Sequence, residues 1–343
     1  MQSKKSLFAK LFKEYRELIE RQLSGEPVKA IFSDAKSYYF MSKYVNAFNS
    51  HMESGKRLRA FLVLLGCNLC GHDPDNNIVT ASLSYELFQN GILMHDDIID
   101  QSGLRRNKPS VYAQFGTPIA ICLGDTGIVA AYDAIVLSGF SDDRKLRALA
   151  NQSKIFKLTV TGELKDIELS DNHDCTLDEI ITMYELKTAY YTFIGPLQLG
   201  IILGGGSDDL LREAQELGRL IGIAFQIKDD IIGVYGKTEI TGKSSVSDIE
   251  EGKNTVLTSY FRECASQDML KEFNAIYGKK NCTEEDCSRI RDLLDESNAR
   301  AMTQELYTKY INDAERILDS MSISDYHKDI FHGMIEYLNE REN

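Results

Sequence analysis

Residues 77–101 read NIVTASLSYELFQNGILMHDDIIDQ, an apolar helical pattern interrupted by two adjacent aspartates, Asp96 and Asp97. A second apolar stretch, residues 223–232, reads IAFQIKDDII and carries another aspartate pair. Carboxylates within a core pattern are unfavourable unless they are paired or bind a metal ion. A solvated cap or an ion pair would explain one such pair equally well. Two pairs, each followed along the chain by basic residues, favour a shared functional site.

The spacing of the acidic residues suits a hard metal cation. On a helix, Asp96 and Asp100 stand four residues apart and share one face. Mg²⁺ takes oxygen ligands, keeps several waters, and is usually held by one or two carboxylates together with substrate phosphates. If the two aspartate-bearing helices face each other across a bundle, their carboxylates converge on one cavity. The pattern therefore predicts a divalent-metal site.

The rest of the chain indicates an all-α fold. Strand signals are nearly absent, whereas apolar residues recur with the 3.6-residue period of a helix from end to end. Helices are expected at about 5–24, 36–50, 56–70, 77–101, 118–139, 142–170, 177–188, 190–204, 208–235, 253–266, 284–319 and 325–341. The polar, glycine-punctuated stretch 236–252 is expected to form a loop. Because no linker separates these segments, residues 1–343 are predicted to form a single domain.

Composition restricts the kind of protein and the kind of partner. Of 343 residues, 43% are hydrophobic and 27% are charged, as in a soluble globular protein. The net charge of −13 argues against a general nucleic-acid binder, but allows an anionic substrate where cations gather locally. We expect no apolar stretch that approaches the roughly 20 residues of a membrane span, and the start MQSKK does not lead into a signal sequence. A cytoplasmic protein without a transmembrane segment is expected.

The seven cysteines form no even framework, which indicates reduced thiols. Cys67 and Cys70 have C-x-x-C spacing with His72 nearby, and a zinc site would need a second ligand pair such as Cys282 and Cys287. Buried structural cysteines are the favoured interpretation.

Basic residues follow or precede both acidic pairs, as a phosphate-bearing substrate would require. Lys56 and Arg59 lie three residues apart and are expected on one helical face, and Arg105 and Arg106 follow the first acidic helix. The further candidates are Lys187 with Thr188 at an expected helix junction, Lys243, and Lys253. Each cluster alone is typical of a solvated surface, but their order around two acidic pairs favours anion binding.

Together these segments resemble the trans-type isoprenyl diphosphate synthases, the polyprenyl synthetase family. The matching segments, in family order, are GKRLR at 55–59, MHDDIID at 94–100, RR at 105–106, GD at 124–125, GELKD at 162–166, KT at 187–188, FQIKDD at 225–230, GK at 242–243 and GK at 252–253. This ordered set is far more specific than one DDxxD motif. The resemblance implies a single large helical bundle of the isoprenoid synthase type, with a central substrate cavity, that forms a homodimer.

The resemblance also implies roles for the matched residues. Asp96 and Asp100 would bind Mg²⁺ ions that hold an allylic diphosphate, and Asp229 would hold a further ion, making three. The ligands of the allylic diphosphate would be Arg105, Lys187 and Lys243, those of isopentenyl diphosphate would be Lys56, Arg59, Gln89 and Arg106, and Lys253 would also bind substrate. The catalytic residues would be Lys187, Thr188 and Gln226, with the oxygens of the last two beside the reacting carbons.

The implied reaction is a Mg²⁺-dependent condensation of isopentenyl diphosphate with an allylic diphosphate to give a linear isoprenyl diphosphate. Metal ions and basic side chains neutralise the charge that develops on the departing diphosphate, so no nucleophilic side chain is required. Gly233 ends the second motif where an aspartate is common, and Glu163 stands where a glutamine is common. Neither departure is interpreted as a loss of activity.

The product length would depend on residues before the first motif. By resemblance, Phe88, Gly91 and Ile92 would line the tunnel for the growing chain, with Gly91 leaving it open and Phe88 forming its floor. A twenty-carbon product, geranylgeranyl diphosphate, is therefore favoured over farnesyl or longer polyprenyl diphosphates. The floor could also come from a neighbouring helix or the dimer partner.

Two other functions fit the sequence less well. A class I terpene cyclase shares the helical fold and the first motif, but residues 229–235 lack its usual second metal motif, and a cyclase needs no second diphosphate site. A non-catalytic partner subunit of a synthase would be expected to lack the acidic motifs, which this chain retains. The sequence leaves open the preferred primer and the downstream pathway.

Overall fold

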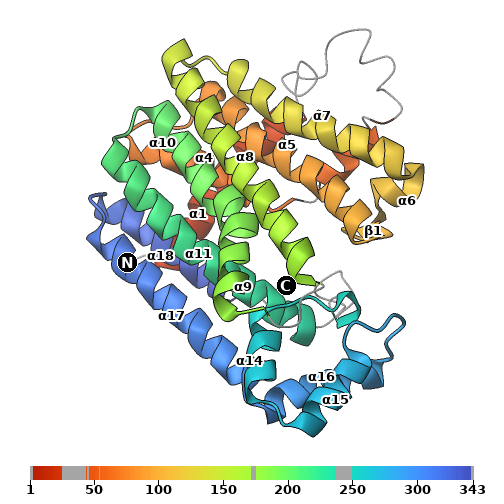
Figure 1. Ribbon diagram of the computed structural model, residues 1–343. Coiled ribbons are helices and arrows are strands. Elements are labelled where there is room, and N and C mark those ends of the chain that lie inside the picture. Colours follow the sequence, from red (N-terminus) through yellow and green to blue (C-terminus); the bar gives the residue numbers. More distant parts are fainter. Residues whose placement is uncertain are drawn as a thin grey trace. The chain divides into compact units, whose positions relative to one another are not determined.

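The computed structural model describes residues 3–24, 44, 46–53, 55–170, 175–236 and 249–340. Nearly all of them are helical (Figure 1). The elements are α1 (Lys4–Leu23), α4 (Leu58–Leu69), α5 (Asn76–Ile99), β1 (Leu104–Arg105), β2 (Lys108–Pro109), α6 (Val111–Phe115), α7 (Thr117–Val136), α8 (Asp142–Ser170), α9 (Leu177–Tyr184), the π-helix η1 (Glu185–Ile194), α10 (Gly195–Gly204), α11 (Asp208–Tyr235), α14 (Val256–Cys264), α15 (Gln267–Ile276), α16 (Glu284–Glu296), α17 (Ala299–Ser320) and α18 (Asp325–Asn339). The prediction of an all-α fold is confirmed.

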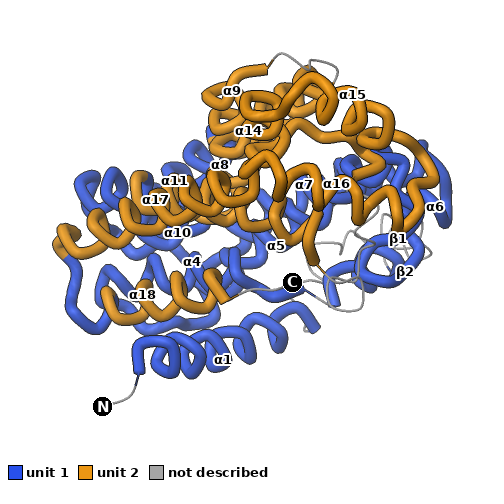
Figure 2. The backbone as a smooth tube through the Cα atoms, turned by 90° about the horizontal axis from the view of Figure 1, so that it is seen from below, with its two compact units in different colours: residues 1–154, 195–215, 323–327 blue, residues 155–194, 216–322, 328–343 orange. Residues whose placement is uncertain are grey.

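The chain divides into two compact units, which Figure 2 distinguishes by colour. Unit 1 consists of Met1–Lys154, Gly195–Gln215 and Ile323–His327. Unit 2 consists of Ile155–Ile194, Glu216–Ser322 and Lys328–Asn343. Two of the boundaries fall inside the long helices α8 and α11 rather than in a linker. That residues 1–343 form one domain stays a prediction.

Unit 1 is built on the contact between α5 and α7, which lie side by side in Figure 1. Glycines bring these helices into backbone contact. A Cβ atom added at Gly91 would lie 2.6 Å from the carbonyl oxygen of Gly124, and one added at Gly127 would lie 2.9 Å from Cα of Gly91. Backbones approach this closely only where side chains are absent. The half of α5 that leads to the first acidic pair is therefore fixed directly on α7.

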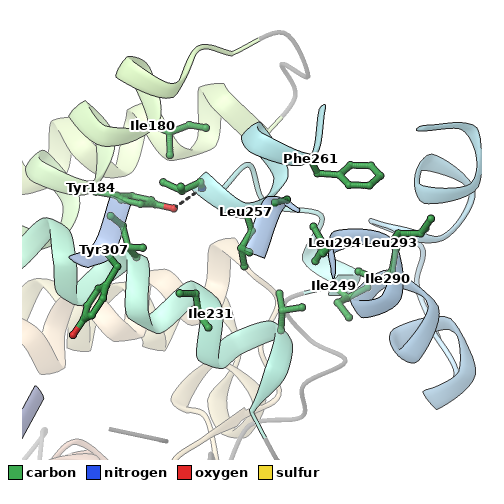
Figure 3. Packing of buried hydrophobic residues seen from close by; sticks show 14 of the residues in the cluster. Ile180, Tyr184, Ile231, Ile249, Leu257, Phe261, Ile290, Leu293, Leu294 and Tyr307 are labelled. Atoms are coloured by element: carbon green, nitrogen blue, oxygen red, sulfur yellow. Dashed lines mark hydrogen bonds between the residues drawn. The ribbon is translucent and has the colours of Figure 1, made fainter. Parts of the chain in front are cut away.

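The core of unit 2 is a cluster of apolar side chains from α9, α11, α14 and α16 (Figure 3). Ile180, Leu257 and Phe261 are fully buried in it, and Ile231 follows directly after the second acidic pair. Tyr184 is also buried there, and Figure 3 shows the hydrogen bond that its hydroxyl accepts. The second acidic pair thus lies on a helix whose apolar face is firmly packed.

The chain stays helical from Leu177 to Gly204, without the junction expected near residue 189. Lys187 and Thr188 lie inside the π-helix η1, which corrects the prediction that they mark a helix junction. Gly162 on α8 allows η1 to come close, because a Cβ atom there would overlap the backbone of Lys187. π-helical segments are rare and frequently occur at functional sites.

Other elements differ from expectation for local reasons. The expected helix 284–319 is two helices, because Asn298 adopts a left-handed conformation (φ 66°) between α16 and α17, which asparagine tolerates better than most residues. The short helices α6 and α15 were not expected, although Ser110 and Ser266 cap their first turns. The expected helix 36–50 falls largely outside the described residues, of which 44 and 46–52 are helical.

The expectation that no apolar stretch approaches the length of a membrane span is wrong for α7. Thr117–Val136 is long and apolar enough by length and composition, and 44% of its most apolar 18-residue window is buried. A core helix meets the same criteria, and α7 packs along α5.

Candidate active site

The first acidic motif lies at the C-terminal end of α5. Asp96 and Asp97 occupy its last turn, and Asp100 is its C-cap, with its backbone N–H donating to the carbonyl of Asp96 at 2.8 Å. Carboxylates are unfavourable at this end of a helix, because the helix dipole places partial negative charge there. Their accumulation therefore indicates a site that is completed by positive charge.

Arg105 supplies part of that charge. Its guanidinium donates to Oδ1 of Asp97 at 2.6 and 2.8 Å and to Oδ2 of Asp96 at 3.1 Å. Burial alone would lower the pKa of Arg105, but Asp97 and Asp96 raise it above its ordinary value. The Asp97 side chain is only 4% exposed, whereas that of Asp96 is 22% exposed. Both aspartates therefore pair with Arg105, and Asp96 is the more accessible of the two carboxylates.

The acidic motif fits a hard divalent cation. Its donors are carboxylate oxygens one helical turn apart, as Mg²⁺ prefers. Within the described ranges, no three His, Cys, Asp or Glu side chains are placed to hold a metal ion together. A metal at Asp96 and Asp100 would thus need oxygens from a ligand or water, which is the usual mode of Mg²⁺ with phosphate substrates.

A tight hairpin turns Arg105 and Arg106 in different directions. Arg105 pairs with Lys108 across the β1–β2 ladder, and the two turn residues, Arg106 and Asn107, have positive φ angles of 54° and 61°. Such angles are required by a type I′ turn and are unusual for arginine. Arg106 donates to the backbone carbonyl of His51 rather than to the acidic motif.

Arg106 lies within a cluster of arginines. Burial lowers its pKa, and so do Arg57, Arg59 and Arg105, whereas the Glu86 carboxylate opposes this effect. Two of these arginines lie at the start of α4, and Glu86 is 4% exposed on α5. The cluster therefore gathers arginines from two separate segments of unit 1 near one buried carboxylate.

Arg57 shapes the start of α4. It is the N-cap in a left-handed conformation (φ 64°), and its buried guanidinium binds Glu86 at 3.2 Å and Glu20 at 2.9 Å. A side chain at Gly55 would collide with this guanidinium. Helix α4 consequently begins at Leu58, so the prediction that Lys56 and Arg59 share a helical face is wrong.

The roles of Arg57 and Glu86 are not predicted from the sequence. Glu86 is an acidic residue within the apolar run 77–101, which is the same signal that identifies Asp96. Lys56 is exposed ahead of α4, and Gln89 lies one turn after Glu86 on α5, partly buried. The structure thus brings Arg59 and Arg106 close to Glu86. Gln89 lies on α5, the helix that also carries Glu86.

In unit 2, a chain of hydrogen bonds joins the predicted catalytic residues to the second acidic pair. The hydroxyl of Thr188 donates to Oε1 of Gln226 at 2.7 Å, and Nε2 of Gln226 donates to Oδ1 of Asp230 at 3.0 Å. The hydroxyl of Tyr184 donates to Oδ2 of Asp230 and accepts from the backbone N–H of Val256 at 3.1 Å. Burial, then Asp230, raises the pKa of Tyr184 well above its ordinary value, so the hydroxyl stays protonated.

This network assigns different environments to the two aspartates of the second motif. Asp230 accepts from neutral donors of α9 and of its own helix, and its bond with Gln226 fixes the amide of that residue. Asp229, the predicted metal ligand, is partly exposed on α11. Tyr184 was not identified from the sequence, and a tyrosine in an apolar run gives no distinctive signal.

The remaining predicted ligands of unit 2 are basic. Lys187 lies between Glu163 and Asp166 of α8, at 2.8 and 2.5 Å. Lys253 pairs with Glu251 at 2.7 Å just before α14. Lys243 lies outside the described residues.

The chain-length prediction needs one correction. Gly91 faces the backbone of α7, where an added side chain would meet Gly124, so it does not leave room for a growing product. Phe88 is 1% exposed and Ile92 is partly buried. Their proposed roles stay predictions.

The C-x-x-C cysteines do not have the environment of metal-binding thiolates. Burial raises the pKa of Cys67 to about 12 and also raises that of Cys70. A thiolate that binds a metal requires the opposite shift.

Residues 42–294 match the model of the polyprenyl synthetase family. A geranylgeranyl diphosphate synthase from Saccharolobus solfataricus is 32% identical over 72% of this chain and 75% of its own length. Another from Methanosarcina mazei is 30% identical over 77% of this chain and 79% of its own length. The chain belongs to the polyprenyl synthetase family and is an enzyme that transfers prenyl groups.

Solved structures of similar proteins share the isoprenoid synthase fold. A geranylgeranyl pyrophosphate synthase from Corynebacterium glutamicum, complexed with isoprenyl diphosphate and magnesium, is 27% identical, with a TM-score of 0.85 over 97% of this chain and 99% of that one. A geranylgeranyl pyrophosphate synthetase from Pyrococcus horikoshii is 27% identical, with a TM-score of 0.80 over 98% of both chains.

Proposed function

We propose that the protein is a Mg²⁺-dependent synthase that condenses isopentenyl diphosphate with an allylic diphosphate to give a linear isoprenyl diphosphate. The observation that carries this proposal is the gathering of Arg57, Arg59 and Arg106 near Glu86, which lies on the same helix as the acidic motif. A terpene cyclase or a metal-binding bundle has no need of a second cationic cluster beside its metal motif. A condensing enzyme must hold a second diphosphate.

In unit 1, the residues divide between two anions. Asp96 and Asp100 hold Mg²⁺, which neutralises the charge that develops on the departing allylic diphosphate. Arg105 keeps Asp96 and Asp97 in place and offers a cation beside them. Arg59 and Arg106, together with Lys56 and Gln89, bind isopentenyl diphosphate.

In unit 2, Asp229 would hold a further metal ion, Lys187 and Lys243 would bind the allylic diphosphate, and Lys253 would also bind substrate. The hydrogen bond from Gln226 to Asp230 turns the amide so that its oxygen faces Thr188. These two oxygens then present negative dipoles to the carbocation that forms when the diphosphate departs. The released diphosphate accepts the proton, so no side chain is required as a base.

We propose a twenty-carbon product. The similarity to geranylgeranyl diphosphate synthases supports this length, while a geranylfarnesyl diphosphate synthase from Aeropyrum pernix, 29% identical over 84% of the chain, makes a longer product the main alternative. Phe88 and Ile92 are the proposed wall residues.

We also propose a homodimer. Three apolar side chains of α7 are exposed in the monomer: Ile121 by 44%, Val129 by 61% and Val136 by 50%. Their spacing places them along one side of the helix. A second copy of the chain would cover them, as light scattering of the purified protein would show.

An elongation assay tests the proposed reaction. The purified protein is incubated with Mg²⁺, isopentenyl diphosphate and, separately, dimethylallyl, geranyl or farnesyl diphosphate, and the products are sized by mass spectrometry. We expect elongation that ends near twenty carbons and that EDTA abolishes. A folded protein that elongates none of the three primers would overturn the proposal.

A further inference from the structure

Lys187 of η1 is bound by two carboxylates from one face of α8. Its Nζ lies 2.8 Å from Oε2 of Glu163 and 2.5 Å from Oδ2 of Asp166. The two acids stand three residues apart on the helix, so their side chains are neighbours. Backbone contact at Gly162 holds Lys187 opposite them. The single positive charge of Lys187 therefore faces two negative charges in this arrangement.

We infer that Glu163 is a specificity-determining residue that competes with the allylic diphosphate for Lys187 and so sets the affinity of the enzyme for that substrate. The inference rests on the proposed function, in which Lys187 binds the diphosphate. An ammonium group has three donors, so a diphosphate oxygen can approach Lys187 before either carboxylate has moved away. It would then lie beside two like charges, which opposes its binding.

Glu163, rather than Asp166, is the partner that gives way. The Asp166 side chain is 12% exposed and lies closer to the ammonium, whereas that of Glu163 is 26% exposed and farther away. Glu163 also has the longer side chain, which can turn towards water. The nearest lysine on α8, Lys165, binds Glu168 and Glu179 at 3.2 Å each and so does not offset the charge of Glu163.

Removing the charge at this position should strengthen diphosphate binding. A glutamine has nearly the same shape, and its amide oxygen can still accept a hydrogen bond from Lys187. One unit charge at a few ångströms in a partly exposed site changes affinity on the order of tenfold. Glu163→Gln should therefore lower the dissociation constant by about that factor, while Glu163→Asp, which keeps the charge, should stay close to the parent protein.

The experiment measures binding rather than turnover. Calorimetric titrations are performed in the presence of Mg²⁺. The two ligands are inorganic pyrophosphate and farnesyl thiolodiphosphate, an unreactive allylic analogue. Glu168→Gln is the matched control, because it removes the same charge from the same helix but from a glutamate that pairs with Lys165. We expect tighter binding for Glu163→Gln only. An equal effect of both substitutions, or none, would overturn the inference.

A double variant tests whether the change in diphosphate affinity acts through Lys187. In a Lys187→Ala background, Glu163→Gln should change the affinity much less, because its target is missing. Elongation is assayed on the same proteins. If the parent protein does not elongate but Glu163→Gln binds pyrophosphate more tightly, the proposed function fails and the competition stands. If the parent protein elongates and affinity is unchanged, the inference fails alone.

Discussion

The two acidic pairs have similar sequences, yet their second aspartates are held by different forces. Asp97 of unit 1 is bound by the guanidinium of Arg105, a full positive charge. Asp230 of unit 2 is bound by two neutral donors, the amide of Gln226 and the hydroxyl of Tyr184. One anchor is an ion pair and the other is a set of hydrogen bonds.

The difference shows what the motif requires. In both units the first aspartate, Asp96 or Asp229, is partly exposed, and the second is fixed by the protein. The second aspartate is therefore fixed by the surrounding protein, through an ion pair in one unit and through hydrogen bonds in the other. We propose that the first position binds the metal ion, which requires a carboxylate.

The largest effect should come from separating these two roles in unit 1. Asp96→Asn should lower kcat/KM by about a thousandfold or more with the fold intact, because an amide is a much weaker metal ligand than a carboxylate. Asp97→Asn should instead lower the free energy of unfolding, by about 2–3 kcal/mol, since Arg105 loses its main partner. Steady-state elongation and thermal unfolding of both variants distinguish the roles. Near-normal turnover of Asp96→Asn would contradict the metal assignment.

A smaller effect is expected from breaking the neutral anchor of unit 2. Tyr184→Phe leaves Asp230 and the N–H of Val256 without the hydroxyl, which should reduce the free energy of unfolding by about 1–3 kcal/mol. Because Asp230 is then held less firmly and it orients the amide of Gln226, kcat should fall more than the affinity for substrate. Urea unfolding and steady-state kinetics measure the two effects. Tyr326→Phe is the control, since Tyr326 is 47% exposed, and equal behaviour of the two variants would refute the anchor.

The smallest effect concerns pH and the cations of unit 1. His51 is 5% exposed, neither ring nitrogen has a hydrogen-bond partner among the described residues, and burial lowers its pKa, as do Arg106, Lys108 and Arg105. The ordinary pKa of histidine is about 6.5. When the pH falls below this value, His51 takes up a proton in the unfolded chain but not in the folded chain. The free energy of unfolding should therefore fall as the pH decreases from about 7 to 5.

Replacing the imidazole removes this dependence. His51→Gln should make the slope of unfolding free energy against pH shallower, by at most about 1.4 kcal/mol per pH unit. Denaturant unfolding at several pH values measures the slope. The exposed His72 supplies the control, and an identical slope for His51→Gln and the parent protein would show that burial and the nearby cations do not keep the proton off His51.

Much of this arrangement could be predicted from the sequence, because its signals are local. The helical period placed both acidic pairs on long helices, α5 and α11, and Arg105 lies only eight residues after Asp97. Helix periodicity and short-range motifs need no knowledge of the tertiary structure.

The missing parts depend on contacts between distant segments. Arg57 and Glu86 are 29 residues apart, and Tyr184 and Asp230 are 46 apart. Gly91 was interpreted as open space because nothing in the sequence shows that α7 passes directly over it. The π-helix around Lys187 has no helical-period signature of its own. Such features depend on tertiary packing, which leaves no local pattern in a single sequence.

The hairpin after α5 has a consequence for how this chain can vary. Surface loops generally accept insertions and deletions. Here the two-residue turn with positive φ angles lets consecutive arginines bind different groups: Arg105 binds the acidic motif, and Arg106 donates to the backbone carbonyl of His51. One added or deleted residue would exchange or misdirect these side chains. The length of this exposed loop should therefore be as constrained as a core position.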